Sequence, residues 1–511
     1  MNAVEHLLGS AALARHGSRA ALVCGGQALS YAQLAADVAR AAGALRTLGV
    51  APGERVLLLM RDTPEFAAAW LGVLHAGAVA VALNPKLSEA EYRHIRSDSG
   101  ARLAIVEDVF AWARADLTTE DAAGGGLMIA GPSAGDTLSW RAALARAAPS
   151  AAPHDAGLED PAFWLYSSGT TGKAKGIVHP HRSVLAAGQG LREVIGLAAG
   201  ERSFATSKLF FAYALEHGLL GPLATGATAI LEPEWPDAET VLARVERERP
   251  NAFFSVPTFY RNLLALGAAR LAPFREVRRF VAAGERLPAS LIEQWRAATG
   301  GEILSLYGMS ETFCACMLTP PGSSNGMRTG KPLAGVDAQL RTAEGKEPAT
   351  GVAAELWLRH PALALGYANR PEQTEAQFRD GWFCTRDLFV RDADGFFSHQ
   401  GRSDERVKIA GQWVQPGELE EAVADDPAIA EAVCVQVTDA EGFERLALFV
   451  TARGDAARAL AAAGRACEQK LPRFKRPNWI RSLDELPRTA TGKLQRFKLR
   501  ELIEQELEKN R

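Results

Sequence analysis

One eleven-residue stretch, YSSGTTGKAKG at residues 166–176, constrains this chain more than any other. Its three glycines let the backbone approach a ligand closely, and its hydroxyl, amide and ammonium groups can all bind phosphate oxygens. The preceding PAFWLY has the apolar character of a buried strand, and α/β proteins hold nucleotides at strand ends. The stretch therefore predicts a phosphate-binding loop, with a plain solvated loop as the alternative. It is not a Walker A loop, because Ala174 follows Gly172-Lys173 where that motif requires Ser or Thr.

Length, charge and cysteine content narrow the class of protein. The 511 residues exceed the usual size of one domain, and 47% hydrophobic with 23% charged residues is typical of a soluble globular protein. A net charge of −3 gives no case for nucleic-acid binding. The six cysteines form no C-x-x-C pair, so neither a zinc site nor a disulfide framework is indicated. The start, MNAVEHLLGS, has an early Glu and no long apolar run, so we do not expect it to be a secretory signal. We expect a reducing, cytoplasmic compartment.

The N-terminal part alternates strand and helix patterns, which predicts an α/β fold of parallel-rich sheets covered by helices. A hairpin turning at Gly25-Gly26 precedes a helix over 31–48, capped near Ser30. Residues 66–83 carry no formal charge and reach the lower length limit of a membrane span. The break near Gly77 favours a helix, a turn and a strand instead. Further expectations are loops over 115–160, a helix over 184–197 and a small antiparallel sheet over 336–357.

The chain changes character near Gly401, where a charged turn, a hairpin and a helix follow one another. From about Glu405 onward the residues suffice for a compact α+β unit of usual domain size. Residues 470–500 contain ten Lys or Arg and two Asp or Glu. This basic stretch is either a solvated face or a surface that meets phosphates.

The full string YSSGTTGKAKG closely resembles the signature loop of the adenylate-forming enzymes, which include acyl- and aryl-CoA ligases, firefly luciferase and the adenylation domains of peptide synthetases. Ala174 stands where these enzymes usually have proline. The resemblance spans about residues 29–496. It implies an N-terminal domain, 1–403, that binds ATP and the acid, and a smaller mobile C-terminal domain, 404–511. It also implies Mg²⁺ as a cofactor and coenzyme A as the co-substrate. The loop residues that it implies as nucleotide ligands are Ser167, Ser168, Gly169, Thr170, Thr171, Gly172 and Lys175.

Two further segments resemble motifs that surround the nucleotide base and the α-phosphate. SLYGMSE, at 305–311, resembles the Y-G-x-[ST]-E string of the family. The resemblance implies that Tyr307, followed by Gly308, stacks near the adenine, that Ser310 offers a hydroxyl to the α-phosphate, and that Glu311 is an oxygen ligand of Mg²⁺. AAGERLP, at 282–288, resembles the small-residue segment under the adenine, and it supplies Gly284 and Glu285.

The remaining motifs concern the ribose, the hinge and the catalytic cation. GWFCTRDL resembles the family's T-G-D motif, so Asp387 would accept hydrogen bonds from the ribose hydroxyls, although Arg386 replaces the usual glycine. GRSDE resembles the family string whose arginine, here Arg402, also reaches the ribose, and the resemblance implies that Asp404 is the hinge of the C-terminal domain. PRTATGKLQR resembles the family's C-terminal P-x-T-x-[ST]-G-K string, which implies Lys493 as the catalytic lysine. Negative charge on the phosphate oxygens during adenylation would be offset by such a fixed cation.

The acid substrate is predicted from KLFFAYALEHG, at 208–218, which resembles the corresponding stretch of benzoate-CoA ligases. Phe211 and Tyr213, with Ala212 between them, could wall a flat ring, and core packing is the alternative. Lys208 could meet the carboxylate or extend to solvent. His217 is either a polar substrate contact or a helix histidine satisfied within the protein. A strand over 312–316 would bring the small Cys314 and Ala315 to the far end of the ring, beside Leu306.

Together these features predict an AMP-forming acid–thiol ligase that converts benzoate or a substituted benzoate to aryl-AMP and then to the coenzyme A thioester. A carrier protein as acceptor, another acid, or a nucleotide-binding regulator without turnover are the alternatives. No membrane span is expected, and the protein would be a monomer or a homodimer.

Overall fold

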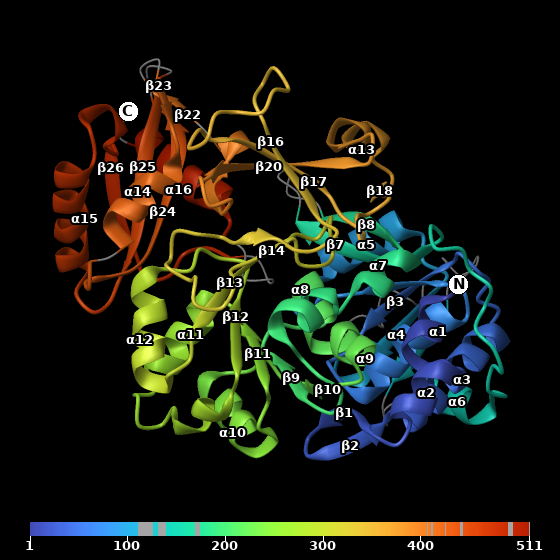
Figure 1. Cartoon of the computed structure of the whole chain (residues 1–511). Helices are drawn as coiled ribbons and strands as arrows, with labels where there is room; N and C mark the ends of the chain where they lie inside the picture. Colours follow the sequence, from blue (N-terminus) through green and yellow to red (C-terminus); the bar gives the residue numbers. More distant parts are fainter. Residues whose placement is uncertain are drawn as a thin grey trace. The chain divides into compact units, whose positions relative to one another are not determined.

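The computed structural model describes most of the chain and divides into two compact units (Figure 1). The large unit comprises Met1–Gln339, Trp357–Cys384 and Arg391–Ser398; the small unit comprises Leu340–Leu356, Thr385–Val390 and His399–Arg511. The predicted domain boundary after residue 403 stays a prediction. The structure describes residues 1–110, 126–130, 139–168, 174–405, 407–409, 412–424, 426–439, 443–488 and 494–509.

A seven-stranded sheet of the large unit carries the strand that leads into the signature loop. Its order is β18-β8-β7-β4-β3-β5-β6, and the neighbours from β7 to β6 are parallel. The antiparallel neighbours β7 and β8 flank the loop. The strands are β3 (Arg55–Leu59), β4 (Val79–Ala82), β5 (Leu103–Glu107), β6 (Gly126–Ala130), β7 (Pro161–Ser168), β8 (Ala174–Pro180) and β18 (Gly366–Tyr367).

A nine-stranded sheet of the same unit has the order β15-β14-β13-β12-β11-β9-β10-β1-β2, with parallel neighbours from β13 to β1. The two parallel-rich sheets confirm the predicted α/β class. The strands are β1 (Ala20–Cys24), β2 (Gln27–Ser30), β9 (Arg202–Ala205), β10 (Thr228–Leu231), β11 (Ala252–Ser255), β12 (Arg279–Ala282), β13 (Ile303–Tyr307), β14 (Met317–Leu318) and β15 (Lys331–Pro332).

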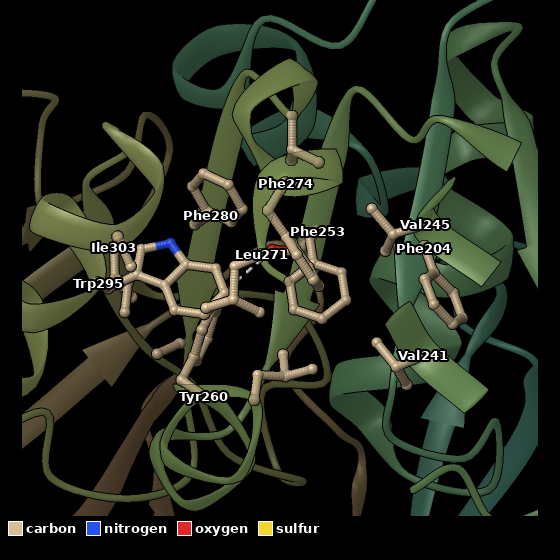
Figure 2. Packing of buried hydrophobic residues seen from close by; sticks show 14 of the residues in the cluster. Phe204, Val241, Val245, Phe253, Tyr260, Leu271, Phe274, Phe280, Trp295 and Ile303 are labelled. Carbon is tan, nitrogen blue, oxygen red and sulfur yellow. Dashed lines mark hydrogen bonds between the residues drawn. The ribbon is translucent and has the colours of Figure 1, made fainter. Parts of the chain in front are cut away.

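An aromatic core fixes β11 and β12 against their helices (Figure 2). Trp295 of α12 (Ala289–Thr299) meets Tyr260 of α11 (Pro257–Leu264) edge-on, with ring centroids 4.9 Å apart. Phe253 meets the same Tyr260 edge-on at 5.6 Å. Edge-to-face aromatic pairs add to the free energy of burial, so the strand ends that approach the site rest on a rigid layer.

Local sequence signals explain several helices. Ser30 and Gln33 form a capping box at the start of α3 (Tyr31–Thr47), as predicted. The apolar stretch at 66–83 is α4 (Pro64–His75) followed by β4, and Gly77 between them has a φ of 84°. Within the described residues, no helix is both long and apolar enough to cross a membrane. Ser88 caps α5 (Glu89–Ser99), and the first two helices are α1 (Ala3–Leu8) and α2 (Ser10–His16).

Three expectations about secondary structure are wrong. The stretch over 115–160 contains β6 and α6 (Trp140–Arg146), because GLMIA pairs with β5 and buried Trp140 anchors the helix. The helix expected over 184–197 is divided into α7 (His181–Ala186) and a π-helical turn, η2 (Leu191–Ile195). Gly188 interrupts it with a φ of 88°. Residues 312–316 form no strand, since Phe313 has a left-handed backbone with a φ of 55°.

Most of the other helices of the large unit lie between β9 and β12 in the sequence. They are α8 (Ala212–Leu215), the π-helical η3 (Glu216–Leu220), α9 (Gly221–Thr225), α10 (Ala238–Glu248), α11 and the 3₁₀ turn η4 (Ala272–Glu276), and α13 (Pro371–Gln377) lies further along the chain.

The small unit has a three-stranded sheet in which β25 pairs antiparallel with β24 and parallel with β26. Two apolar clusters belong to this unit, one including α14 and α15 residues and the other α16 residues. Its elements include β22 (Val407–Ile409), β23 (Gln412–Val414), α14 (Pro416–Ala424), β24 (Ile429–Thr438), β25 (Glu444–Ala452), α15 (Ala456–Lys470), η6 (Arg473–Lys475), β26 (Trp479–Leu483) and α16 (Arg496–Lys509).

The predicted small sheet is formed by strands whose residues are divided between the two units. Its order is β16-β17-β20-β19, with β21 paired to β20, and β19 and β20 are antiparallel. The strands are β16 (Asp337–Arg341), β17 (Ala354–Arg359), β19 (Phe378–Arg379), β20 (Trp382–Arg391) and β21 (Phe397–Arg402), after which the 3₁₀ turn η5 (Ser403–Glu405) follows.

Candidate active site

The signature loop connects the ends of β7 and β8. Ser167 pairs with Lys175 across this hairpin, and Ser168 is the last residue of β7. The loop's apex lies outside the described residues, and so does the predicted catalytic lysine. The predicted site residues concerned are Gly169, Thr170, Thr171, Gly172 and Lys493.

Glu311 and Lys175, which were predicted from separate motifs, meet in the large unit. Lys175 Nζ lies 3.3 Å from Glu311 Oε1 and 3.8 Å from the centroid of the Tyr367 ring. The Tyr367 hydroxyl donates to the same Glu311 oxygen at 2.8 Å. The Glu311 side chain is only 12% exposed, so its carboxylate is fixed beside a cation at the end of the phosphate-binding hairpin.

Two buried histidines, which the sequence analysis missed, fix the loop that carries Glu311. His179 Nε2 donates to the Ser310 carbonyl at 2.8 Å, and His360 Nε2 donates to the Ala315 carbonyl at 3.1 Å. Burial lowers the pKa of His179 to about 3 and that of His360 to about 4, so both imidazoles are neutral near pH 7. The only sequence signal for His179 was its position in β8 directly after the signature loop.

The residues predicted near the adenine follow neighbouring strand ends. β12 and β13 are parallel, with Ala282 opposite Ser305, so Gly284 lies just past the carboxyl end of β12 and Tyr307 is the last residue of the neighbouring β13. Gly284 has a φ of 83°, which favours glycine. Glu285 accepts hydrogen bonds from the Thr258 amide at 3.0 Å and its hydroxyl at 2.7 Å, and so it also satisfies the N-terminus of α11. Gly308 lies against the backbone of residues 314 and 315.

The predicted ribose ligands meet in the small unit. Arg402 Nη1 lies 3.2 Å from Asp387 Oδ1, and Arg402 also donates to both carboxylate oxygens of Asp404 at 2.8 and 2.9 Å. These carboxylates raise the pKa of Arg402 above its usual value against the opposing effect of burial. Asp387 is 6% exposed. Arg386, at the expected glycine position, keeps a glycine-like backbone with a φ of 60°.

Several of the predicted substrate residues gather in the large unit around η3. Phe211 precedes α8, which contains Ala212 and Tyr213, and the Tyr213 hydroxyl donates to the Val281 carbonyl at 3.1 Å. The His217 ring lies 5.0 Å from the Tyr213 ring. Ala315 donates its amide to Glu216 Oε2 at 3.0 Å, which brings the second segment, with Cys314, to the same helix. Leu306 is buried in β13.

Lys208 has protein partners of its own. Its side chain is 3% exposed, so the outward extension considered from the sequence is wrong. Its ammonium group donates to the carbonyls of Glu232, Pro233 and Glu234 and lies 3.6 Å from Asp62 Oδ2. This geometry stabilises the segment after β10, and the predicted contact of Lys208 with the substrate carboxylate stays a prediction.

Family models and known proteins match the chain over almost its full length. Residues 10–368 match the AMP-binding enzyme family, and residues 418–493 match the C-terminal domain of AMP-binding enzymes. The chain belongs to the AMP-binding enzyme family. It is 38% identical to a 3-hydroxybenzoate–CoA ligase of Aromatoleum sp. (strain CIB), over 98% of this chain and 97% of that protein.

Two further relatives of this AMP-binding enzyme are named as ligases of an aromatic acid. A benzoate–CoA ligase of Thauera aromatica is 35% identical over 98% of this chain and 95% of that protein. The crystal structure of a benzoate CoA ligase from Burkholderia xenovorans LB400 superposes with a TM-score of 0.88 at 33% identity, covering 98% of this chain and 100% of that chain. The predicted resemblance to the adenylate-forming superfamily, and to benzoate-CoA ligases within it, is thereby confirmed.

The residues present would fit a magnesium ion that binds together with the nucleotide. Among the described residues there is no group of three or more His, Cys, Asp or Glu that could hold a metal. Mg²⁺ usually binds through one or two carboxylates plus substrate phosphates, so Glu311 alone meets the requirement on the protein side. Such an ion would offset phosphate charge beside Lys175.

Proposed function

We propose that this AMP-binding enzyme is an aryl-CoA ligase. It adenylates benzoate or a substituted benzoate with ATP and transfers the acyl group to the thiol of coenzyme A. The observation that carries the proposal is the short loop from Glu311 to Ala315. Its first residue lies beside Lys175, and its last residue is bonded to the helix that follows Phe211 and Tyr213. Five residues thus join the proposed nucleotide contacts to the proposed ring contacts. The relatives named as 3-hydroxybenzoate–CoA and benzoate–CoA ligases support a benzoate as the acid substrate.

The first half-reaction joins the acid to the α-phosphate. A carboxylate oxygen of the acid attacks the α-phosphorus of ATP, the bond to the β-phosphate oxygen breaks, and pyrophosphate leaves. Ser310 would donate to an α-phosphate oxygen, Glu311 would hold Mg²⁺, and Lys493 would supply the fixed cation. Asp387 and Arg402 would bind the ribose. His179 and His360 fix the loop backbone and require no proton change to do so.

The second half-reaction releases AMP. The sulfur of coenzyme A attacks the carbonyl carbon of the mixed anhydride, and the carbon–oxygen bond to AMP breaks. The thioester and AMP are the products, and the thiol proton leaves to solvent or base.

The acid is expected to carry its carboxylate directly on one aromatic ring. Tyr213 is held by its hydroxyl bond and cannot swing aside, while Cys314 and Ala315 are small. Overfilling a packed site commonly costs about 1–3 kcal/mol, which disfavours a long flexible chain. A modest substituent such as a hydroxyl, amino or halogen group would fit beside the small residues.

One assay series tests this function. Pyrophosphate release would be measured across benzoates, cinnamates and fatty acids, and thioester formation would be measured with free coenzyme A. We expect the highest kcat/KM with a benzoate and a thioester product. Higher efficiency with octanoate or cinnamate than with every benzoate would reject the aryl assignment. Adenylation without transfer to free coenzyme A would favour a carrier protein as acceptor, and no pyrophosphate release at all would favour a regulator.

A further inference from the structure

The π-helical turn η3 begins with two buried polar residues. The proposed chemistry gives Glu216 no role, and the sequence left His217 open as a substrate contact or a helix histidine satisfied within the protein. Glu216 and His217 are 2% and 1% exposed. Among the described residues, no lysine or arginine affects the pKa of Glu216 or of His217. π-Helical turns are rare and frequently mark functional sites. Burying such groups costs free energy unless hydrogen bonds replace their water.

The hydrogen bonds of His217 fix which ring nitrogen can meet a ligand. Nδ1 lies 2.9 Å from the carbonyl oxygen of Tyr213, and a carbonyl can only accept, so Nδ1 carries the proton. Burial lowers the pKa of His217 to about 4, which leaves Nε2 as an acceptor near neutral pH. Nε2 has no hydrogen-bond partner among the residues that the structure describes. The ring lies 5.0 Å from that of Tyr213 and 4.5 Å from that of Phe254.

Glu216 ties this imidazole to the predicted far end of the ring. Its Oε2 accepts the Ala315 amide at 3.0 Å and lies 3.4 Å from His217 Nδ1. The thiol of the neighbouring Cys314 donates to the Ser183 carbonyl at 3.8 Å. Burial raises the pKa of Glu216 to about 8, so the floor around Ala315 carries no formal charge near neutral pH. An uncharged aryl substituent can therefore approach without meeting an unpaired ion.

We propose that His217 is a specificity-determining residue whose Nε2 accepts a hydrogen bond from a hydroxyl group on the aromatic ring, and that Glu216 positions Ala315 for this contact. The inference rests on the proposed aryl-CoA ligase function and narrows its substrate to a hydroxybenzoate. A hydroxyl group can donate a hydrogen bond to Nε2 of His217. The ring hydrogen of benzoate and the halogen of a halobenzoate cannot donate one. A buried group built to bond a substrate hydroxyl rejects an analogue that lacks it, because the protein atom is then left unpaired.

The test compares kcat/KM for benzoate, 3-fluorobenzoate, 3-hydroxybenzoate and 4-hydroxybenzoate in the wild type and three variants. His217→Phe keeps a flat ring between Tyr213 and Phe254 but removes the acceptor. We expect it to lower kcat/KM for the preferred hydroxybenzoate by about 10–100-fold and that for benzoate by less than about 3-fold. His217→Gln places an amide near the same position and should restore part of the preference. His75→Phe, at a buried histidine of α4 whose Nε2 also lacks a partner, is the matched control for stability and should leave all four values unchanged.

Glu216 is tested by a matched pair of variants. Glu216→Gln keeps an oxygen that can accept the Ala315 amide, and it should retain the wild-type hydroxybenzoate-to-benzoate ratio. Glu216→Ala removes that oxygen and should reduce the ratio, with thermal midpoints of both variants measured to exclude unfolding.

The outcomes separate the inference from the function on which it rests. Equal losses for benzoate and hydroxybenzoates in His217→Phe, or a wild type that prefers benzoate, would overturn the role of Nε2 while leaving an aryl-CoA ligase. Absence of pyrophosphate release with every benzoate would reject the function and the inference together. An unchanged ratio in Glu216→Ala would reject the positioning role alone.

Discussion

At the scale of single residues, Arg386 shows how a motif can keep its geometry after losing its usual side chain. The family resemblance leads one to expect glycine there, and the arginine nevertheless has a φ of 60° inside β20. A left-handed backbone costs a non-glycine residue roughly 1–2 kcal/mol. Asp387, directly after it, is still buried and bonded to Arg402.

Replacing Arg386 by glycine should stabilise the protein. We expect Arg386→Gly to raise the free energy of unfolding by about 1 kcal/mol, because glycine adopts this φ without the steric cost. Urea denaturation followed by fluorescence measures the change. Arg386→Ala removes the same charge and keeps the strain, so its stability should stay near that of the wild type. A rise of equal size in both variants would assign the effect to charge.

Lys493 is the residue whose proposed role separates the two half-reactions most sharply. Lys493→Ala should lower the rate of adenylation by about 10²–10³, since a fixed donor to developing charge is removed. Thioester formation from synthetic aryl-AMP and coenzyme A should survive, because that step needs no charge offset at the pyrophosphate. Pyrophosphate release and thioester yield are measured separately. Lys498→Ala, in α16, serves as the control. Equal loss of both steps would contradict the assignment.

At the scale of elements, the loop from Ser310 to Ala315 depends on side chains from distant parts of the chain. His179 of β8 and His360 after β17 each donate to a carbonyl of the loop. Glu216 of η3 accepts the Ala315 amide, and Tyr367 of β18 donates to Glu311. The loop is irregular, so these bonds replace the regular hydrogen bonding that a helix or strand would supply.

The two histidines predict a loss of stability in acid. Their folded-state pKa values, about 3 and about 4, lie below the unfolded value of 6.5, so the folded state binds fewer protons. The contribution is fully present above pH 6.5 and is lost as the pH falls towards 4 and 3. At pH 5 each histidine should cost about 2 kcal/mol relative to pH 7. Thermal midpoints over this range measure the slope.

Variants of the two histidines can test whether the fall in stability with pH comes from the loop from Ser310 to Ala315. His179→Gln and His360→Gln keep a donor without titrating, so each should flatten the decline between pH 6.5 and 4. Part of the slope should remain, because burial also lowers the pKa values of His181 and His217 to about 4. A slope that is undiminished in the double variant His179→Gln, His360→Gln would place the acid sensitivity elsewhere.

At the scale of the whole molecule, sequence patterns predicted those parts that depend on neighbours along the chain. The capping box at Ser30 and the break at Gly77 are local, and the ordered motifs placed Lys175 and Glu311 in one site before any contact was known. Contacts between distant segments could not be predicted. Glu216 and Ala315 are 99 positions apart, and no pattern in either segment names the other.

The predictions for two irregular segments were wrong for a related reason, because contacts with distant residues determine their structure. The sequence analysis predicts a strand over 312–316, but the left-handed Phe313 and the hydrogen bonds with His360 and Glu216 determine the course of this segment. Similarly, the helix expected over 184–197 is interrupted where an added Cβ at Gly188 would lie 3.0 Å from the Gly221 carbonyl oxygen. Tertiary contacts override local propensity at such positions.

The two half-reactions give the whole molecule a testable conformational requirement. The family resemblance assigns Asp404 to the hinge of a C-terminal domain that presents different faces in adenylation and thioester formation. Within the small unit, Asp404 lies in η5 and receives two hydrogen bonds from Arg402. Any substitution of Asp404 thus changes an ion pair as well as the backbone, and the hinge must be tested with both effects separated.

Asp404→Pro and Asp404→Ala provide that separation. Both remove the carboxylate that Arg402 binds, but only proline restricts φ to about −65° and removes the amide hydrogen. We expect Asp404→Pro to retain adenylation, measured as pyrophosphate release, and to lose most thioester formation from aryl-AMP and coenzyme A. Asp404→Ala should retain both steps, because its backbone still rotates. If the alanine variant loses thioester formation to the same extent, the ion pair with Arg402 is responsible and not backbone rotation. If the proline variant completes both steps at the wild-type rate, rotation at residue 404 is not required for catalysis.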